Sequence, residues 1–292
     1  MLKRELNFQG DTPLLYLIAT PIGNLEEFSS RAISILKEMD YVACEDTRNS
    51  GMLLKKFGID LPLISCHEHN EEKASEKILS LMEEGKKIAY MSDAGYPIIS
   101  DPGERLARKV IEKGFKVSVV NGPNAGLCAF VCSGIPSNHF YFYGFLESKP
   151  STRKKQLESL KDFQDTIIFY ESPHRIGDTL KDMAAILGKE RQACLARELT
   201  KKHEEFIRGT LGELSELSPD TLIGEMVIVV EGAKEIAKEI TDEDIKSYLA
   251  TALEKMKSKD AIKEISNQYS LPKNRVYDIY LKNWKNALVN KK

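Results

Sequence analysis

Short apolar segments rich in β-branched residues alternate with helix-period segments over most of this chain. The first predicted strands lie at 14–19, 41–44, 87–91 and 116–120. Between them, apolar residues recur with helical spacing at 32–39 and 74–82, and Gly85 follows the second stripe as a helix C-terminal cap. Strands that alternate with helices need crossover connections, which make neighbouring strands parallel. The pattern therefore predicts an open α/β sheet.

A second group of strands is predicted further along the chain, at 140–145, 166–170, 192–196 and 226–230. The aromatic, alternating character of 140–145 suggests a mixed sheet. The two groups are separated by the turn-rich segment 121–126, which is the expected domain junction.

Strand signals vanish from Thr241 onward, where Thr-Asp-Glu-Asp resembles a capped helix start. Two further helices, joined at Leu271-Pro272, give a helix-turn-helix outline. We therefore expect two α/β domains, 1–120 and 121–235, and a small all-helical module at 236–292.

Composition limits the class of protein. The 292 residues carry 42 Lys and Arg against 44 Asp and Glu, so a uniformly basic nucleic-acid coat is excluded, although local patches are not. No apolar run approaches the roughly 20 residues that span a bilayer, and the N-terminus lacks a signal-peptide core. The five cysteines are odd in number and sparse, as expected for reduced thiols in a cytoplasm.

Nearly every predicted strand ends in glycine, proline and charged residues. These segments are 20–25, 45–48, 92–103, 121–123, 171–175 and 197–201. A single segment of this kind could be an ordinary polar turn. Six in succession favour a binding site, because ligands of open α/β sheets bind beyond the carboxyl ends of the strands.

Several familiar sites are missing from the sequence. No Gly-x-Gly-x-x-Gly follows a predicted strand, and there is no phosphate loop, His-Glu-x-x-His, Cys-x-x-Cys or Gly-x-Ser-x-Gly motif. His67 and His69 could ligate a metal, but alternate strand residues rarely do so without a third ligand, and no metal site is expected. Cys128 and Cys132 lie one helical turn apart in an apolar stretch, which favours core packing.

Two basic stretches stand out against the balanced charge. One runs from Ser148 to Lys161, with cations at Lys149, Arg153, Lys154, Lys155 and Lys161. The other begins at Leu271, with cations at Lys273, Arg275, Lys282, Lys285, Lys291 and Lys292, and its aromatic residues are Tyr277, Tyr280 and Trp284. Each alone is most simply a solvated face, but together they favour a polyanionic partner such as RNA. Trp284 is more simply the core of the small helical unit.

Six motifs closely resemble the ribosomal RNA small subunit methyltransferase I family, which belongs to the tetrapyrrole-methylase-like, S-adenosylmethionine-dependent class. They are 17–25 (LIATPIGNL), 44–48 (CEDTR), 67–70 (HEHN), 92–103 (SDAGYPIISDPG), 169–175 (FYESPHR) and 196–205 (ARELTKKHEE). The resemblance covers about residues 14 to 232. Tyr96, Asn121 and Asn124 depart from the residues that are usual in the family.

The resemblance implies two α/β domains of the tetrapyrrole methylase type with S-adenosylmethionine in the cleft between them, and a homodimer. It also implies methylation of a cytidine 2′-hydroxyl in the decoding region of 16S rRNA, within the small ribosomal subunit. The implied cofactor-binding residues are Pro21, Gly23, Asn24, Ser92, Asp93, Ala94, Gly95, Pro97, Asn124, Ala125, Tyr170 and Glu171. Segment 224–227 would approach the adenine.

A ribose hydroxyl is a very weak acid at neutral pH, so a nearby general base, or a cation that stabilises the developing alkoxide, should help the expected chemistry. The candidates are Asp93, Asp101, Glu171, Glu198, His174, Arg175 and Lys201. We expect Glu171 or Glu198 to accept the proton, and Arg175 or Lys201 to hold a phosphate or the developing alkoxide. The alternative is that these four residues form an ion-pair network that only shapes the cleft.

Two other functions stay open at this point. One is a methyltransferase that acts on a tetrapyrrole or a related small molecule, and the other is a non-catalytic RNA-binding protein of ribosome assembly. The basic stretches and the 169–175 motif argue against the first, and the clustered strand-end acids argue against the second.

Overall fold

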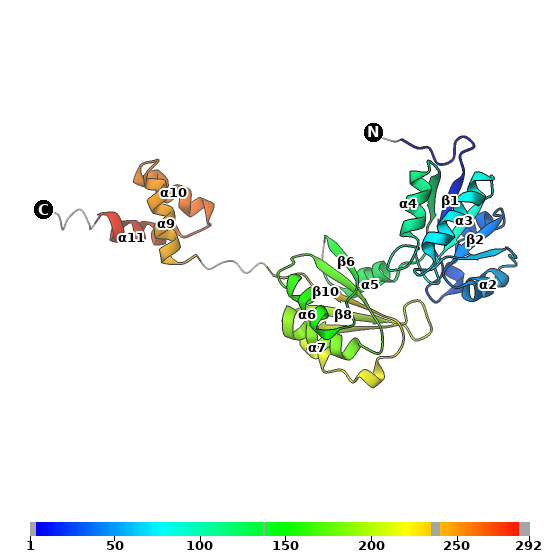
Figure 1. Ribbon diagram of the computed structural model, residues 1–292. Coiled ribbons are helices and arrows are strands. Elements are labelled where there is room, and N and C mark those ends of the chain that lie inside the picture. Colours follow the sequence, from blue (N-terminus) through cyan, green and yellow to red (C-terminus); the bar gives the residue numbers. More distant parts are fainter. Residues whose placement is uncertain (1–3, 137, 235–239, 286–292) are drawn as a thin grey trace. The chain divides into compact units, whose positions relative to one another are not determined.

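The computed structural model describes residues 4–136, 138–234 and 240–285. The chain forms two compact units, Met1–Lys234 and Glu235–Lys292. The first unit contains two five-stranded sheets and their helices, and the second is helical (Figure 1). Both predicted strand groups therefore lie within one compact unit. No helix in the described ranges is long and apolar enough to cross a membrane.

The first sheet has the strand order β3-β2-β4-β1-β5, and all of its pairings are parallel. The strands are β1 (Leu14–Ile18), β2 (Tyr41–Cys44), β3 (Leu63–Ser65), β4 (Ile88–Met91) and β5 (Lys116–Val120). The predicted open parallel sheet is confirmed. Because the strands run the same way, all their carboxyl ends meet at one edge.

Helices cover both faces of this sheet (Figure 1). They are α1 (Ser30–Leu36), α2 (Thr47–Lys56), α3 (Glu71–Glu83) and α4 (Glu104–Glu112), with a short 3-10 turn, η1, at Leu25–Glu27. On β2, Val42 packs into the core with α1 and α2, and its neighbour Ala43 packs with α3 and α4. Successive side chains of a strand point to opposite faces, so a strand covered on both sides is apolar throughout.

The second sheet is mixed, in the order β6-β7-β10-β8-β9. Its strands are β6 (Phe140–Phe145), β7 (Thr166–Glu171), β8 (Gln192–Arg197), β9 (Glu205–Thr210) and β10 (Met226–Val230). β6 and β7 are parallel, and the other pairings are antiparallel. The prediction of a mixed sheet is confirmed.

Helix α5 (Ala125–Ser133) covers one face of this sheet, and α6 (Pro150–Ser159), α7 (Ile176–Leu187) and α8 (Leu211–Ser215) cover the other. A 3-10 turn, η2, follows at Pro219–Thr221. Strand β10 contributes side chains to the apolar cores on both faces of the sheet. Met226, Ile228 and Val230 pack with α6, α7 and α8, and Val227 and Val229 pack with α5.

The second unit contains α9 (Asp242–Leu253), α10 (Ser258–Gln268), α11 (Lys273–Tyr280) and a π-helical turn, η3 (Leu281–Lys285). Thr241 caps α9 by accepting from the Asp244 N–H, and the Asp244 side chain accepts from the Thr241 N–H. The three helices share a small core that also contacts Trp284. The predicted capped start, the helix pair and the core position of Trp284 are confirmed.

The sequence patterns missed β3 and β9, both at sheet edges. β3 has only three residues, and β9 carries Arg208 and Gly209 in its interior, so neither has the alternation of a half-buried strand. Core packing is also wrong for Cys132, which is exposed, whereas Cys128 is partly buried and packs against the α5-side core.

Candidate active site

The polar strand-end segments gather at one end of the strands in each sheet, here called its edge. In the first sheet they follow the parallel strands β1, β2, β4 and β5. In the second sheet β7 and β8 end beside the start of β10, since Glu171 and Arg197 both pair with Met226. β9 begins at the same edge, because Glu205 pairs with Arg197. Residues far apart in the sequence thus reach the same edge.

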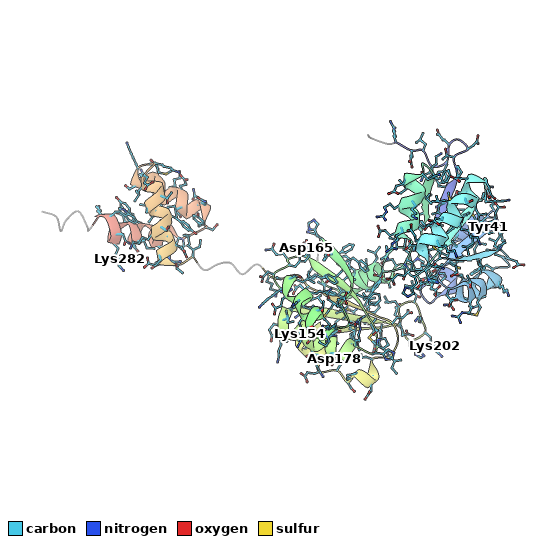
Figure 2. The ribbon with its side chains drawn as sticks, viewed as in Figure 1. Tyr41, Lys154, Asp165, Asp178, Lys202 and Lys282 are labelled. Atoms are coloured by element: carbon cyan, nitrogen blue, oxygen red, sulfur yellow. The ribbon has the colours of Figure 1, made fainter. Side chains whose placement is uncertain are left out.

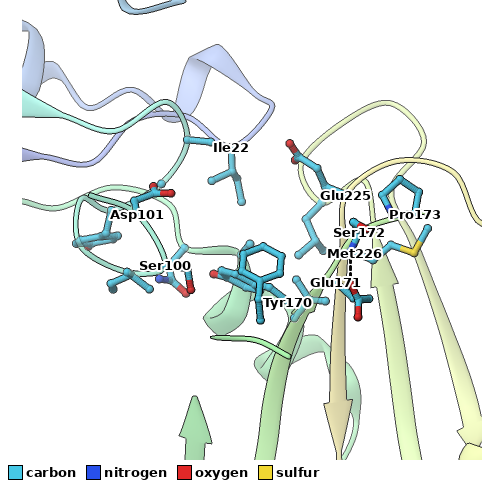
Figure 3. Close-up of a pocket in the computed structure, with 18 residues that line it drawn as sticks. Ile22, Ser100, Asp101, Tyr170, Glu171, Ser172, Pro173, Glu225 and Met226 are labelled. Atoms are coloured by element: carbon cyan, nitrogen blue, oxygen red, sulfur yellow. Dashed lines mark hydrogen bonds between the residues drawn. The ribbon is translucent and has the colours of Figure 1, made fainter. Parts of the chain in front are cut away.

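A cavity of about 330 Å³ is lined by segments from both edges. Its lining residues are Ile22, Ala94, Gly95, Tyr96, Ile99, Ser100, Asp101, Asn124, Ala125, Phe145, Tyr170, Glu171, Ser172, Pro173, Leu199, Glu225, Met226 and Val227. Figure 3 shows Asp101 and Ser100 on one side of the hollow and Glu225 and Met226 on the other. The lining is mostly apolar with a few carboxylates and hydroxyls, which is typical of a small-molecule site.

The predicted cofactor residues divide between two hollows. Six line the main cavity, namely Ala94, Gly95, Asn124, Ala125, Tyr170 and Glu171. Pro21, Gly23, Ser92 and Asp93 line a second hollow of about 270 Å³, together with residues of α2. Asn24 and Pro97 line neither of these two hollows.

Sequence reasoning missed several apolar lining residues, among them Ile22, Ile99, Phe145 and Leu199. Three of them lie inside the quoted motifs but carry no polar group that would mark them. Phe145 is the last residue of an aromatic strand, and this strand-end position is the one signal of its role in the sequence. Side chains of this kind supply most of the surface that an organic ligand buries.

The segment from Ser92 to Gly103 is bent into the cavity by unusual backbone angles. Gly95 has φ 77°, and the non-glycine residues Ile98 and Ser100 have φ 76° and 63°. Gly95 exchanges two backbone hydrogen bonds with Thr20, and the Ile98 N–H donates to the Pro102 carbonyl at 3.2 Å. Left-handed angles at a β-branched residue cost free energy, and such outliers cluster at functional sites.

Asp101 is the ionisable group at the cavity with the strongest shift. It is half-buried, and burial raises its pKa to about 7, with the nearby Glu45 and Asp93 carboxylates adding to the effect. A carboxyl group that titrates near neutral pH can both accept and release a proton there. Asp101 is thus suited to acid–base chemistry at the cavity wall.

Glu171 has a different environment, although it lies at the same cavity. It is 3% exposed and accepts from the Arg175 guanidinium at 2.7 Å, from the Ser172 N–H at 2.7 Å and from the Thr179 hydroxyl at 2.6 Å. Arg175 also donates to the Leu146 carbonyl at 3.3 Å. These contacts tie the end of β7 to the first turn of α7.

Glu198 and Lys201 lie in the β8–β9 loop and contact each other. The Lys201 Nζ lies 3.0 Å from Glu198 and 3.1 Å from Glu225. The hydrogen bond from Lys201 lowers the pKa of Glu198 below its usual range. Neither residue is among those that line the main cavity, whereas Glu225 is.

The β8–β9 loop also bridges to the first sheet. The Asn24 N–H donates to the Thr200 hydroxyl at 3.1 Å, and a side chain at Gly23 would meet the Lys201 stem at 2.5 Å. Thr200 itself has a positive φ of 63°. The Gly23 position therefore requires glycine so that the two segments can pack closely.

No group of three or more His, Cys, Asp or Glu side chains in the described parts of the chain could hold a metal ion. His67 and His69 instead contact each other edge to face, with ring centroids 6.0 Å apart. They line a polar hollow with acidic residues at the ends of β2 and β4.

The basic stretches are only partly free for a partner. Arg153 is 4% exposed and pairs with Asp182 at 2.7 Å, so its expected role in phosphate binding is wrong. Arg275 pairs with Asp242 at 2.7 Å, within the second unit. Lys154 is exposed, among the outward side chains of the second-sheet helices (Figure 2), and reaches the same Asp182 at 3.4 Å.

The remaining cations of these stretches are exposed where the structure describes them. They are Lys149, Lys155, Lys161, Lys273, Lys282 and Lys285. The predicted contributions of Lys291 and Lys292 lie outside the described residues. Tyr277 is 44% exposed, and Tyr280 stacks on Trp284 with ring centroids 6.3 Å apart.

Comparison with known proteins agrees with this geometry. The sequence matches the family "Tetrapyrrole (Corrin/Porphyrin) Methylases" over residues 14–215. It is 45% identical to "Ribosomal RNA small subunit methyltransferase I" of Bacillus subtilis, over 96% of this chain and 99% of that protein. The Haemophilus influenzae protein of the same name is 41% identical, over 92% and 97% of the two chains.

Solved structures share the fold at low sequence identity. A cobalt precorrin-4 methyltransferase aligns with a TM-score of 0.58 and 16% identity, over 75% of this chain and 94% of that one. The uroporphyrin-III-C-methyltransferase from Thermus thermophilus aligns with a TM-score of 0.53 and 18% identity, over 75% and 94%. The predicted α/β class, the tetrapyrrole methylase type and the helical C-terminal region are therefore confirmed.

Proposed function

Because this chain belongs to the ribosomal RNA small subunit methyltransferase I family, we propose that it methylates the 2′-hydroxyl of a cytidine in 16S rRNA, with S-adenosylmethionine as donor. The observation that carries the proposal is a single cavity, lined from both sheets, that contains a carboxyl group with a pKa of about 7, Asp101. The relatives' name supports the substrate class, and a substrate of this kind implies a cytoplasmic enzyme.

The residues of the cavity fit the proposed cofactor. Apolar side chains such as Ile22, Leu199 and Val227 offer a surface for an adenine ring, and carboxylates face the same hollow as partners for a sulfonium cation. Asn124 caps α5 through its side chain, and the Tyr170 hydroxyl accepts from the Gly126 N–H at 3.2 Å, so that its proton is left for a ligand. When bound, the cofactor would supply an activated methyl group.

In the proposed reaction, the bound cofactor would supply its methyl group to a ribose 2′-hydroxyl, and the protein must take up the proton that this hydroxyl loses. The hydroxyl proton passes to Asp101, which we favour over Glu171 and Glu198 as the base. Glu171 is saturated by donors from Arg175, Ser172 and Thr179, as expected for the ion-pair alternative. The lowered pKa of Glu198 makes it a weak base. We also propose that Arg175 or Lys201 holds a phosphate or the developing alkoxide.

The proposed RNA contacts use exposed cations that form no salt bridge within the described part of the chain. Lys149 lies between β6 and α6, and Lys155 and Lys161 lie on and just after α6. Phosphate contacts of this kind supply most of the affinity for RNA and weaken as salt rises. The exposed Tyr277 of the second unit could stack on an unpaired base.

We also propose that the enzyme is a homodimer. Leu127 and Val131 on α5 and Phe140 and Tyr141 on the edge strand β6 are 43–75% exposed. Exposed apolar patches of this kind mark association surfaces. Sedimentation equilibrium should give twice the chain mass, and a Leu127→Lys/Val131→Lys variant should give a monomer. If the wild-type chain sediments as a monomer both undiluted and after 50-fold dilution, the dimer is refuted.

The function is tested by incubating the full chain with methyl-labelled S-adenosylmethionine and undermethylated small ribosomal subunits. Label in 16S rRNA at one alkali-resistant linkage is the expected result, since a 2′-O-methyl group blocks strand cleavage at that position. Free 16S rRNA in a parallel reaction shows whether the assembled subunit is required. Label in an offered tetrapyrrole instead would favour the small-molecule alternative. No transfer to either acceptor would favour a non-catalytic RNA-binding role.

A further inference from the structure

Glu71 is a buried acid that the proposed mechanism does not use. It begins α3, is 6% exposed, and directs its carboxylate at another helix. Its Oε1 atom accepts from the N–H of Gly103 and from the N–H of Leu106, each at 3.1 Å. Its own carbonyl accepts from the Ser75 hydroxyl at 2.6 Å, which holds the first turn of α3.

These two N–H groups belong to the start of α4, whose cap position is Gly103. No side chain of that segment caps the helix, because glycine has none. The first N–H groups of a helix have no partner within it, and the helix dipole favours an anion there. Glu71 supplies both the acceptor and the negative charge from α3.

Gly103 is also the last residue of the strained segment from Ser92 to Gly103, which carries Asp101. Gly103 has φ 122° and lies so close to the buried Tyr90 ring that a Cβ atom would be 2.6 Å from its Cε1 atom. Asp101 precedes Gly103 by two residues, and the backbone between Ile98 and Pro102 is closed by one hydrogen bond. The exit of this tight turn is therefore fixed by Glu71 on one side and by Tyr90 beneath it.

We propose that Glu71 is a positioning residue whose carboxylate clamps the exit of the 98–102 turn and thereby holds the Asp101 carboxyl group at the cavity wall. This inference rests on the proposed function, in which Asp101 is the base. Without the clamp, the N-terminus of α4 loses its acceptor and the strained turn can relax towards solvent. Asp101 would then be both misplaced and better hydrated.

The pH dependence of turnover separates positioning from a purely structural role. Glu45 and Asp93, at the ends of β2 and β4, raise the pKa of Asp101. Tyr90 of β4 and Tyr170 of β7 lie near enough for the Asp101 charge to raise their own pKa. None of them is removed by a change at position 71. A general base must be ionised, so turnover rises with pH to a plateau, and the midpoint follows the burial of Asp101.

The decisive variant is Glu71→Ala, with Glu72→Ala as its matched control. Glu72 also links α3 to α4, through Lys109 at 2.5 Å, but that contact lies beyond the first turn of α4. We expect Glu71→Ala to lower kcat at least 10-fold at pH 8 and to move the midpoint of the pH profile to lower pH. Glu72→Ala should change neither quantity more than 2-fold or beyond error. Glu71→Gln, which keeps the Oε1 acceptor, should restore kcat to within 3-fold of wild type.

Activities are expressed per folded enzyme, measured by circular dichroism. If Glu71→Ala matches Glu72→Ala in kcat and in midpoint, the positioning role is refuted. If Glu71→Ala does not fold, Glu71→Asp is the deciding variant, because its shorter side chain cannot reach both N–H groups. An Asp variant with wild-type kcat and midpoint would then overturn the proposal.

Asp101→Asn, measured in parallel, keeps the two proposals distinguishable. If Asp101→Asn retains full turnover, the assignment of the base fails, and the role of Glu71 falls with it. If Asp101→Asn is inactive while Glu71→Ala behaves as its control, only the role of Glu71 fails.

Discussion

Glu171 gives the sharpest test of what the cavity carboxylates do. Replacing it with alanine removes the acceptor for Arg175 and for the Thr179 hydroxyl, which is itself fully buried. Breaking a buried ion pair from one side costs about 3–5 kcal/mol, because the remaining charge stays buried without its partner. The Arg175 side chain is 25% exposed and can be partly rehydrated. We therefore expect the lower end, a loss of about 3 kcal/mol in the free energy of unfolding.

The thermodynamic measurement is urea unfolding followed by far-ultraviolet circular dichroism. The single tryptophan, Trp284, packs on the core of the second unit, so its fluorescence reports on the unfolding of that unit. Thr179→Val is the companion variant, because it keeps the shape and removes one hydrogen bond to a charged group. Its expected cost is about 2 kcal/mol. In a double-mutant cycle, the double variant should lose less unfolding free energy than the sum of the two single losses, by at least about 1 kcal/mol. The reason is that both variants remove the same contact.

Turnover decides between a structural and a catalytic Glu171. Glu171→Gln keeps the size of the side chain, and we expect its kcat per folded enzyme to stay within 3-fold of wild type. A Glu171→Ala variant whose unfolding free energy is unchanged within about 0.5 kcal/mol would refute the ion-pair reasoning, since that is the size of an ordinary surface substitution. A stable Glu171→Gln variant with kcat reduced 100-fold would restore Glu171 as the base.

Three further predictions follow from single features. Burial raises the pKa of Asp101 from its usual 3.8 to about 7 in the folded chain, so its ionisation destabilises the fold as pH rises from about 4 to 7. Asp101→Asn should therefore be more stable than wild type at pH 8 and equal to it at pH 3.5 in urea unfolding. Gly103→Ala should cost at least about 2 kcal/mol in the same assay, because of its positive φ and the contact with Tyr90. Deletion of residues 236–292 should weaken the binding of small ribosomal subunits by at least 10-fold in a filter-binding assay. The Kd for S-adenosylmethionine, measured by calorimetry, should stay unchanged. Equal losses in both affinities would contradict this prediction.

Periodicity and motif order predicted both sheets, apart from two edge strands. Strands such as β4 and β10 are buried on both faces and are therefore apolar throughout, which is a strong signal in sequence. Edge strands such as β3 have no such requirement. Their pairing depends on a neighbour that is distant in sequence, and single-sequence patterns do not contain that information.

The sequence predicted which strand-end segments form the candidate site, but not which of their side chains contact one another. Several residues of the predicted strand-end segments, such as Ile22 and Leu199, line the cavity. The sequence favoured Glu171 and Glu198 as the base, whereas we propose Asp101. That ranking depends on hydrogen-bond partners such as Thr179, eight residues from Glu171, and Lys201, three residues from Glu198. Burial and partners set the pKa of a carboxyl group, and both are properties of the folded chain.

Asp101 and Glu171 illustrate why the two acids at one cavity should have different roles. Glu171 accepts several hydrogen bonds and an ion pair, so its carboxylate oxygens are already engaged by Arg175, Ser172 and Thr179. Asp101 is shielded from water and lies near the acidic Glu45 and Asp93, which makes its ionised form costly. Proton uptake by Asp101 relieves that cost. Acid–base pairs in enzymes are separated by such differences of environment, and our proposal that Glu171 is structural and Asp101 is the base rests on this difference.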